Sequence, residues 1–378
     1  MKLAAIADAI LDETSTPAQL RGALREFSDL CSIESGIEPN KSFDAWAEDS
    51  FLDSGVAINA QAAAHCVTDY LRTVVFIRGV NAALNTALEQ FPDVPIKVLY
   101  AGCGPYASLL LPLLHRFDPT RLDLTFLDYH QHSLDSVAHL VEFFGCQNYA
   151  ICLQQADATQ YRNSEPLHLV IAEVMQKALE QEPQFAVTAN LAPQLHDDGV
   201  FIPGKIEVRL CFGNLACERE TFRTQGEIDT ESLILSGSRV MLDSVMAIES
   251  KQAAALEKTA VLDLRTGSKR LPPQLIDIPP LSEICGLDPL LLTRIQVYAH
   301  HRLGDYEAEI TLPLLCTEIA RAQAGAPVYV SYELGGYPKL QFSTELGSAA
   351  STCESGGGRR PQSAPISDAG DEDPGRLQ

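Results

Sequence analysis

The segment from residue 96 to residue 212 constrains the fold of this 378-residue chain more than any other feature. Short apolar runs alternate there with stretches of helical pattern. Strands are expected at residues 96–101, 122–127, 149–153, 167–172 and 206–212, and helices near 107–115 and at 134–144. This rhythm predicts an α/β fold with a doubly wound, mostly parallel Rossmann-like sheet.

The flanking segments have other patterns. Before the alternating block, an apolar run at 2–11, a capping box from Thr16 to Gln19 and a stretch at 60–88 predict helices. After it, a helix is expected at 231–256, and alternating stretches at 294–300, 306–312, 328–334 and 340–343 predict antiparallel strands. The expected parts are a helical N-terminal segment (1–92), a Rossmann-like domain (93–212), a smaller β-rich domain for substrate binding and dimerisation (213–346), and a disordered tail (347–378) that is nearly free of apolar residues.

The composition excludes several kinds of partner. Asp and Glu number 50 against 28 Lys and Arg, and the resulting net charge of −22 repels nucleic acid. The apolar runs are shorter than the roughly 18 residues that cross a bilayer, and no charged-then-apolar leader opens the chain. The ten cysteines form no Cys-x-x-Cys pair, which argues against a structural metal. We therefore expect a cytoplasmic protein without membrane or nucleic acid partners.

A glycine motif follows the first strand of the alternating block. Gly102, Cys103 and Gly104 begin a Gly-x-Gly-x-x-Ala sequence, in which glycines allow a tight turn and the close approach of a cofactor. Asp128 ends the second strand, where a carboxylate can accept hydrogen bonds from both ribose hydroxyls of an adenosine. Asp157 follows the third strand, where an adenine amino group would lie.

Two cofactors fit this arrangement, a dinucleotide and S-adenosyl-L-methionine. A dinucleotide needs free amides at a helix N-terminus for its pyrophosphate, and Pro105 removes one such donor. S-adenosyl-L-methionine carries no phosphate, so the missing donor matters less. The alternative without a ligand is a tight strand-to-helix turn, with Asp128 as a solvated strand end.

Two glutamates follow the fourth strand. Glu173 comes directly after it, and Glu182 lies nine residues further on, before Pro183. On one straight helix, at about 100° per residue, the two side chains would face opposite ways, so they converge only if the chain folds back between them. Helical patterning would instead pair Glu173 with Glu180 on a solvated acidic helix.

Further motifs give the chain a resemblance to a known family. Residues 69–73 read Asp-Tyr-Leu-Arg-Thr ahead of the glycine motif, and residues 198–203 read Asp-Gly-Val-Phe-Ile-Pro after the glutamates. Together with the glycine motif, the strand-end acids and the spacing of the glutamates, this order resembles the class I S-adenosyl-L-methionine-dependent methyltransferases. It is most similar to the protein arginine methyltransferases and their bacterial relatives that act on free arginine, over about residues 43–212.

The resemblance implies a role for each motif. Arg72 would bind the methionine carboxylate of S-adenosyl-L-methionine, and Gly102, Cys103, Gly104, Asp128 and Asp157 would surround the rest of the cofactor. Glu173 and Glu182 would be catalytic: they would grip a planar guanidinium, aim one nitrogen at the methyl group and provide a base for the released proton. No metal ligand is expected.

The chain also departs from the family pattern. The family's Ser-Glu-Trp-Met-Gly is Ala-Glu-Val-Met-Gln at 172–176, and the Thr-His-Trp loop is missing. His300 and His301 lie in about the right region but are expected to be ordinary surface histidines. The N-terminal aromatic helix is suggested only by Phe-Asp-Ala-Trp at 43–46. These gaps favour a small cationic guanidino or amino substrate, with free arginine ahead of protein arginine.

Two other functions stay open. One is N- or O-methylation of a different small molecule in a natural-product pathway, with Glu173 alone orienting the nucleophile. The other is a methyltransferase-like interaction protein without activity, although the presence of Arg72, Gly102, Gly104 and Asp128 together argues against it. A homodimer is a further expectation.

Overall fold

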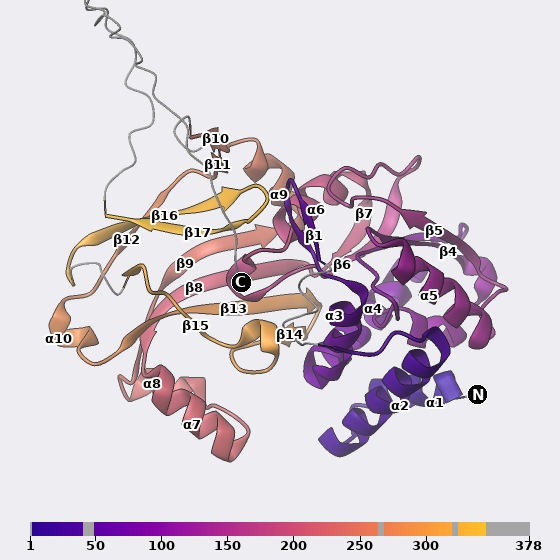
Figure 1. Cartoon of the computed structure of the whole chain (residues 1–378), viewed down its shortest axis with the longest axis horizontal. Helices are drawn as coiled ribbons and strands as arrows, with labels where there is room; N and C mark the ends of the chain where they lie inside the picture. The colour runs from indigo at the N-terminus through magenta and orange to yellow at the C-terminus, as the bar shows by residue number, and fades with distance from the viewer. Residues whose placement is uncertain (1, 41–48, 264–267, 320–323, 345–378) are drawn as a thin grey trace, which may run out of the picture. The chain divides into compact units, whose positions relative to one another are not determined.

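The computed structural model describes residues 2–40, 49–263, 268–319 and 324–344. These residues belong to one compact unit, Met1–Leu346, and Gly347–Gln378 forms a second unit. The aromatic segment at 43–46 and the predicted disordered tail lie outside the described residues. Every helix and strand labelled in Figure 1 belongs to the first unit.

A parallel sheet forms from the alternating block. Its strands are β3 (Ile96–Ala101), β4 (Leu122–Asp128), β5 (Ala150–Gln155), β6 (Leu167–Ala172) and β7 (Leu195–Ile202). They lie in the order β5-β4-β3-β6-β7, and all neighbours are parallel (Figure 1). The chain builds outward from β3 to β5 and then returns to place β6 on the other side of β3. The predicted doubly wound α/β class is confirmed.

Helices cover both faces of this sheet, which explains why its inner strands are almost continuously apolar. On one face, Val98 and Tyr100 share a core with α4 (Tyr70–Gln90) and α5 (Gln131–Phe143). On the other face, Leu99 and Ala101 share a core with α6 (Gln184–Leu191). Alternate residues of β3 therefore enter opposite layers, as the two-residue period of a strand requires.

The N-terminal segment is mostly helical. It contains α1 (Lys2–Leu11), α2 (Pro17–Ser35), the hairpin of β1 (Ser50–Leu52) and β2 (Gly55–Ala57), α3 (Ala60–His65) and the 3₁₀ turn η2 (Cys66–Thr68). The predicted capping box is present at the start of α2. The predicted helix at 60–88 is broken between α3 and α4. There the Cys66 carbonyl accepts hydrogen bonds from the side chains of Arg72 (3.3 Å) and Thr73 (3.4 Å), which compete with helical bonding.

The helix predicted near 107–115 is wrong. After the glycine motif the chain makes turns and then the 3₁₀ segments η3 (Leu111–Arg116) and η4 (Pro119–Arg121). Ala107 has a left-handed φ of 43°, and Pro112 has no N–H to donate to a helix. The glycine motif is therefore not followed by an α-helix N-terminus. The helix predicted at 134–144 is confirmed as α5.

The C-terminal region contains two antiparallel sheets, as predicted for a β-rich part. In the first, β8 (Lys205–Gly213) lies between β9 (Arg239–Glu249) and β13 (Asp288–Tyr298), while β14 (His301–Leu303) and β15 (Leu314–Leu315) pair with β13. In the second, β16 (Pro327–Leu334) pairs with β11 (Lys269–Arg270), β12 (Gln274–Asp277) and β17 (Lys339–Ser343), and β10 (Val261–Leu262) pairs with β11. Other elements are α7 (Leu215–Gln225), α8 (Thr230–Leu235), α9 (Ser250–Glu257), α10 (Leu281–Ile284), η5 (Lys177–Leu179), η6 (Ala192–Gln194) and η7 (Glu309–Thr311).

Three predictions for individual elements are wrong. The strand at 206–212 does not join the parallel sheet: Pro203 and Gly204 bend the chain out of β7, and β8 then pairs antiparallel with β9 and β13. Residues 231–256 are not one helix, because β9 occupies the middle of that range. The strand at 306–312 is replaced by a turn and η7.

A buried ion network explains the last two corrections. Arg239, at the start of β9, is 1% exposed, and its guanidinium donates hydrogen bonds of 2.7 Å to both Glu218 and Asp305. Tyr306 has a left-handed φ of 66° and donates its hydroxyl to Glu218 at 2.8 Å. These partners are distant in the sequence, so local patterning cannot show that Arg239 begins a strand or that Tyr306 interrupts one.

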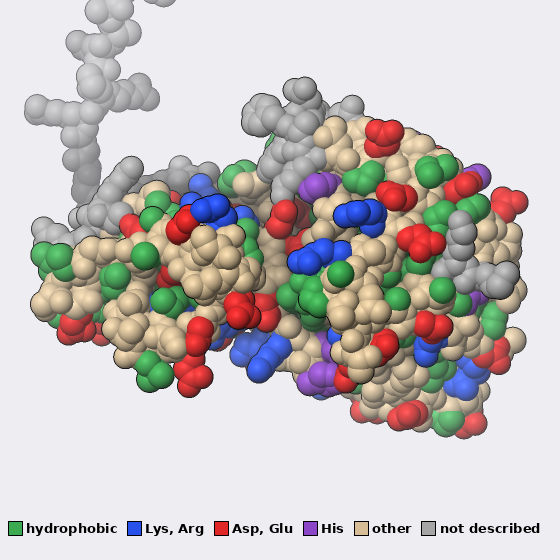
Figure 2. All heavy atoms as spheres, turned by 90° about the horizontal axis from the view of Figure 1, so that it is seen from below, with side chains coloured by type: hydrophobic (Ala, Val, Ile, Leu, Met, Phe, Trp, Pro, Cys, Tyr) green, Lys and Arg blue, Asp and Glu red, His purple; other side chains and the backbone are tan. Residues whose placement is uncertain are grey.

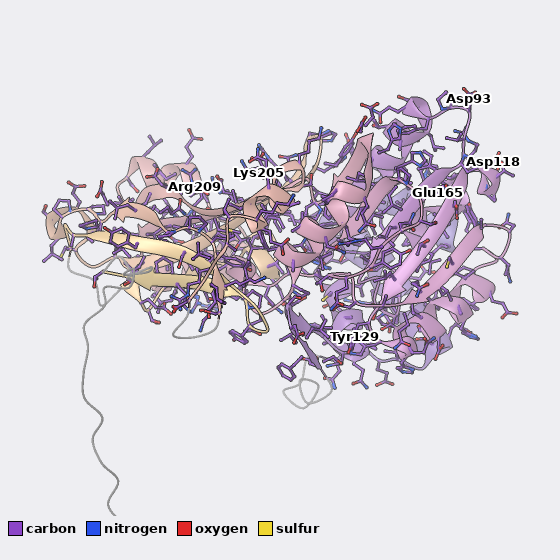
Figure 3. All side chains as sticks on the ribbon, turned by 90° about the horizontal axis from the view of Figure 1, so that it is seen from above. Asp93, Asp118, Tyr129, Glu165, Lys205 and Arg209 are labelled. Atoms are coloured by element: carbon purple, nitrogen blue, oxygen red, sulfur yellow. The ribbon has the colours of Figure 1, made fainter. Side chains whose placement is uncertain are left out.

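Residues labelled in Figure 3 mark the two edges of the parallel sheet at which its strands begin and end. Asp93, Asp118 and Glu165 precede β3, β4 and β6 and lie toward one edge, whereas Tyr129 follows β4 and lies toward the opposite edge. The carboxyl ends of the strands therefore share the edge near Tyr129. Open α/β sheets bind their ligands beyond this edge, where the strand order reverses.

The surface and the helices add two observations. Acidic side chains are distributed over the face drawn in Figure 2, in keeping with the net charge of −22. In the described ranges, no helix combines the length and the apolar character needed to cross a membrane.

Candidate active site

A cavity of about 330 Å³ opens at the carboxyl edge of the parallel sheet. Small-molecule sites commonly have volumes of roughly 300–1,000 Å³. Every site residue predicted from the sequence lines this cavity: Arg72, Gly102, Cys103, Gly104, Asp128, Asp157, Glu173 and Glu182. The fold thus brings together residues from α4, from the ends of the four parallel strands β3, β4, β5 and β6, and from the segment before α6.

The glycine motif is a tight turn that ties β3 to β4. Gly102 and Gly104 have φ values of 65° and 62°, in the left-handed region that favours glycine. The N–H groups of Gly102 and Cys103 donate to the Leu127 carbonyl at 2.8 and 3.2 Å. A Cβ on Gly102 would collide with Cγ1 of Val174, so glycine is needed where the loop after β6 crosses the motif.

We expect Gly102→Ala to lower the free energy of unfolding by about 1–3 kcal/mol, because its Cβ would strain the backbone and collide with Val174. Denaturant unfolding measures the loss. Gly22→Ala is the matched control: Gly22 lies inside α2 with nothing within 4 Å of its Cβ position, so alanine there should add about 0.5–1 kcal/mol. Unchanged stability of Gly102→Ala would contradict this account of the turn.

Asp128, the last residue of β4, is held by two backbone amides. Its Oδ2 accepts from the Gly104 N–H and its Oδ1 from the His130 N–H, each at 2.9 Å. A carboxylate has about four lone-pair sites, so both oxygens can also accept hydroxyl groups of a ligand. Next to it, burial raises the pKa of the Cys103 thiol well above its ordinary value, which keeps Cys103 a neutral packing residue.

Asp157 shapes the loop after β5. Its Oδ1 accepts from the Thr159 N–H (2.8 Å) and hydroxyl (2.7 Å), and its Oδ2 accepts from the Gln160 amide (3.2 Å). Asp157 therefore caps a turn at the rim of the cavity. Its further lone pairs can accept from an amino group in the cavity.

Arg72 and Glu173 form a buried ion pair between α4 and the end of β6. Arg72 Nη2 contacts Glu173 Oε2, and the residues are 7% and 9% exposed. Arg72 Nη1 also donates to the Cys66 carbonyl at 3.3 Å. A guanidinium offers five N–H donors, so Arg72 can bind Glu173 and an anionic ligand group at the same time.

Glu182 lies close enough to Arg72 for the two side-chain charges to interact. The residue is 6% exposed, and burial raises the pKa of its carboxyl to about 7. The Arg72 charge and a hydrogen bond with the Gln176 side chain oppose this rise, and the Asp49 carboxylate adds to it. Glu182 is thus near its midpoint at neutral pH, which suits a group that takes up and releases a proton.

The segment between the two glutamates is a loop. Ala178, Leu179 and Gln181 have left-handed φ values of 55°, 60° and 68°. Each such non-glycine residue costs roughly 1–3 kcal/mol and persists only where its surroundings impose it. The chain folds back, so the half-turn mismatch of a straight helix does not arise. The alternative of one acidic helix that pairs Glu173 with Glu180 is wrong.

Three acidic residues at the cavity were not predicted from sequence patterns. Asp49, Asp69 and Glu309 line it, which brings the Asp and Glu residues of its described lining to seven, against Arg72 and Lys177. Asp69 precedes α4, and its Oδ2 accepts from the Glu309 N–H at 2.6 Å. The motif at 69–73 was a signal for Asp69, but neither Asp49 nor Glu309 has a recognisable motif around it.

His300 and His301 do not line the cavity. Their ring centroids are 4.0 Å apart, and His301 packs beside Gly79 of α4. Burial lowers the pKa of His301, so it is neutral at physiological pH. In the part of the chain that the structure describes, no group of three or more His, Cys, Asp or Glu residues is arranged to hold a metal ion.

A second cavity, of about 540 Å³, adjoins the first. Glu182 and Pro183 line both cavities. The second is also lined by the end of β16, the turn after it and the start of β17, from Tyr332 to Lys339. The segment that carries Glu182 therefore separates the parallel-sheet site from a space bounded by the C-terminal sheet.

Comparisons with known proteins find little close similarity. No protein-family model matches the chain, and no curated protein matches it. Among solved structures, the chain is similar to one described as the Trypanosoma brucei PRMT1 enzyme-prozyme heterotetrameric complex with AdoHcy, at 13% sequence identity and a TM-score of 0.42. The likeness covers 75% of this chain and 92% of that chain.

Proposed function

We propose that the protein is an S-adenosyl-L-methionine-dependent N-methyltransferase that acts on a guanidino group. The observation that carries this proposal is the buried set of Arg72, Glu173 and Glu182 at the carboxyl edge of a parallel sheet, on one cavity with Asp128. An acid at the end of β4 suits ribose hydroxyls, and two nearby acids suit a planar cation.

The glycine turn favours S-adenosyl-L-methionine over a dinucleotide. The N–H groups of Gly102 and Cys103 are bonded to Leu127, the N–H of Gly104 is bonded to Asp128, and Pro105 has none. The next helical elements after this turn are the 3₁₀ segments η3 and η4 rather than an α-helix. The amides of Gly102, Cys103 and Gly104 are therefore already engaged and less available to a pyrophosphate, whereas a cofactor without phosphate does not need them.

The remaining contacts fit the other parts of that cofactor. Arg72 has donors for a carboxylate, and the Asp128 carboxylate has lone pairs for two hydroxyls. When bound, S-adenosyl-L-methionine supplies an electrophilic methyl group on its sulfonium. Glu173 and Glu182 would then orient the acceptor, and Glu182, with a pKa of about 7, would hold the proton that the acceptor nitrogen loses.

The charge of the cavity supports a cationic acceptor. Its described lining holds seven acidic residues against Arg72 and Lys177, so a guanidinium is attracted before it is positioned. Free arginine or a related small molecule is our preferred acceptor, because the family's Thr-His-Trp loop is missing from the sequence. The second candidate is a small amine or hydroxyl acceptor held by one acid. That acid would be Glu173, which directly follows β6.

The test has two stages. Calorimetry with S-adenosylhomocysteine and with NAD should detect binding of the first only, and the reverse result would overturn the methyltransferase proposal. Mass spectrometry of reactions with S-adenosyl-L-methionine and a panel of free arginine, an arginine-containing peptide, simple amines and phenols then identifies the acceptor. Methylation of an amine or phenol without methylation of arginine would favour the second candidate.

We expect Asp128→Ala to weaken S-adenosylhomocysteine binding by about 10- to 100-fold, the size of hydrogen bonds to a charged group. Asp118→Ala is the matched control. Asp118 caps a turn before β4 through Thr120 (2.9 and 2.8 Å), at the opposite edge of the sheet (Figure 3). Both variants lose local backbone hydrogen bonds, but only Asp128→Ala should change the dissociation constant. Equal affinities in calorimetry would remove Asp128 from the cofactor site.

A further inference from the structure

The conformation of the loop that carries Glu173 and Glu182 is fixed only in part by bonds within the loop. Its left-handed residues Ala178, Leu179 and Gln181 are disfavoured locally. Its backbone makes three hydrogen bonds within the loop, from the N–H groups of Leu179, Glu180 and Glu182, and further ones to partners outside it. The conformation therefore depends on the elements that supply those partners.

Two buried hydroxyl groups of the C-terminal sheets hold the turn of the loop. The Thr293 hydroxyl, from β13, accepts from the Ala178 N–H at 2.9 Å. The Tyr332 hydroxyl, from β16, donates to the Leu179 carbonyl at 2.6 Å. Thr293 is 1% exposed and Tyr332 is 2% exposed, so water cannot easily replace either bond.

Two backbone contacts hold the segment next to Glu182. The Gln181 N–H donates to the Pro338 carbonyl, and the Gln181 carbonyl accepts from the Val56 N–H, both at 2.8 Å. Gly55 packs so closely that a Cβ there would lie 2.8 Å from the Gln181 carbonyl oxygen. The β1–β2 hairpin and the turn between β16 and β17 thus both bind the loop, although they lie far apart in the sequence.

We propose that Thr293 and Tyr332 are positioning residues of the acceptor site. Through them, the C-terminal sheets impose the left-handed turn that brings Glu182 back to Glu173. The inference rests on the proposed function for its consequence in catalysis, but the positioning itself can be measured without an acceptor.

The charged and titratable groups around Glu182 make its position measurable. Arg72 of α4, Cys66 of η2 and Asp49 before β1 interact electrostatically with it, and Asp53 of the β1–β2 turn shares the second cavity with it. Burial is the largest influence on this carboxyl. If the loop relaxes, Glu182 gains solvent, and the stability difference between Glu and Gln at this position shrinks.

The first experiment is a double-mutant cycle on stability. Thermal unfolding is compared at pH 4 and pH 8 for the parent, Glu182→Gln, Tyr332→Phe and the double variant. We expect the rise in melting temperature that Glu182→Gln causes at pH 8 to fall by at least half in the Tyr332→Phe background. An undiminished rise would overturn the positioning role. This arm uses the full chain without an acceptor, so its failure is distinct from failure of the proposed function.

The second experiment measures turnover and cofactor affinity. Tyr332→Phe and Thr293→Val should each lower kcat by about 10-fold or more, with S-adenosylhomocysteine affinity within about twofold, since they act on the acceptor loop. Thr293→Ser keeps the hydroxyl and should restore most of the turnover. Tyr149→Phe is the control, because this buried tyrosine also donates to a backbone carbonyl, that of Phe117 at 2.8 Å, away from the cavity. Equal kcat in Tyr332→Phe and Tyr149→Phe would contradict the proposal.

Discussion

Replacing Glu182 by glutamine is expected to lower kcat by about 100-fold or more, while S-adenosylhomocysteine affinity stays within about twofold. Glutamine keeps the shape of the side chain but removes the negative charge and the basic oxygen. The lost interaction is with the acceptor and is strongest in the transition state, so it affects turnover more than cofactor binding. Steady-state kinetics and calorimetry measure the two quantities.

Glu180 offers a matched control in the same loop. It is half-buried, lies two residues before Glu182 and does not line the cavity. Glu180→Gln should therefore keep nearly full turnover. If Glu180→Gln lost turnover while Glu182→Gln kept it, the guanidinium clamp formed with Glu173 would be wrong.

Glu182→Gln is also expected to stabilise the protein at pH 8, by on the order of 3 kcal/mol. The pKa of Glu182 is about 7 in the folded protein, against an ordinary value of 4.5. The folded state thus holds this proton more tightly than the unfolded state does. The stability of the parent falls as pH rises from about 4.5 to 7 and then stays at the lower value, whereas glutamine has no charge to bury.

Denaturant unfolding of both proteins at pH 4 and pH 8 tests this sign. At pH 4 Glu182 is largely protonated in both states, so the two proteins should differ little. A gain at pH 8 together with a loss of turnover would identify Glu182 as a residue retained for function at a cost in stability. A loss of stability at pH 8 would mean that contacts with Arg72 outweigh the burial of the charge.

Much of the fold follows from local patterns. The parallel strands are short apolar runs, and the two-residue period of a strand lets both faces be buried. Since parallel strands end at a common edge, the positions of Gly102, Asp128 and Glu173 at the ends of the first, second and fourth strands are enough to predict that they share a site. The capping box of α2 was likewise readable, because it depends on residues three apart.

Other elements depended on contacts that sequence patterns do not contain. The segment at 231–256 has helical character locally, but the burial of Arg239 against Glu218 and Asp305 places its middle, residues 239–249, in β9. The helix predicted after the glycine motif does not form, because Ala107 adopts a left-handed conformation. In the case of β9, long-range packing outweighed local propensity.

The sequence by itself determined which residues at the strand ends reach the cavity, because strand ends and their spacing are local properties. Only the tertiary structure decided how they act together. It pairs Arg72 with Glu173, buries Glu182 until its pKa is about 7, and holds the loop between the two acids through Thr293 and Tyr332. The physical reason is that charge state and backbone strain depend on burial and on partners, and these partners lie more than a hundred residues away along the chain.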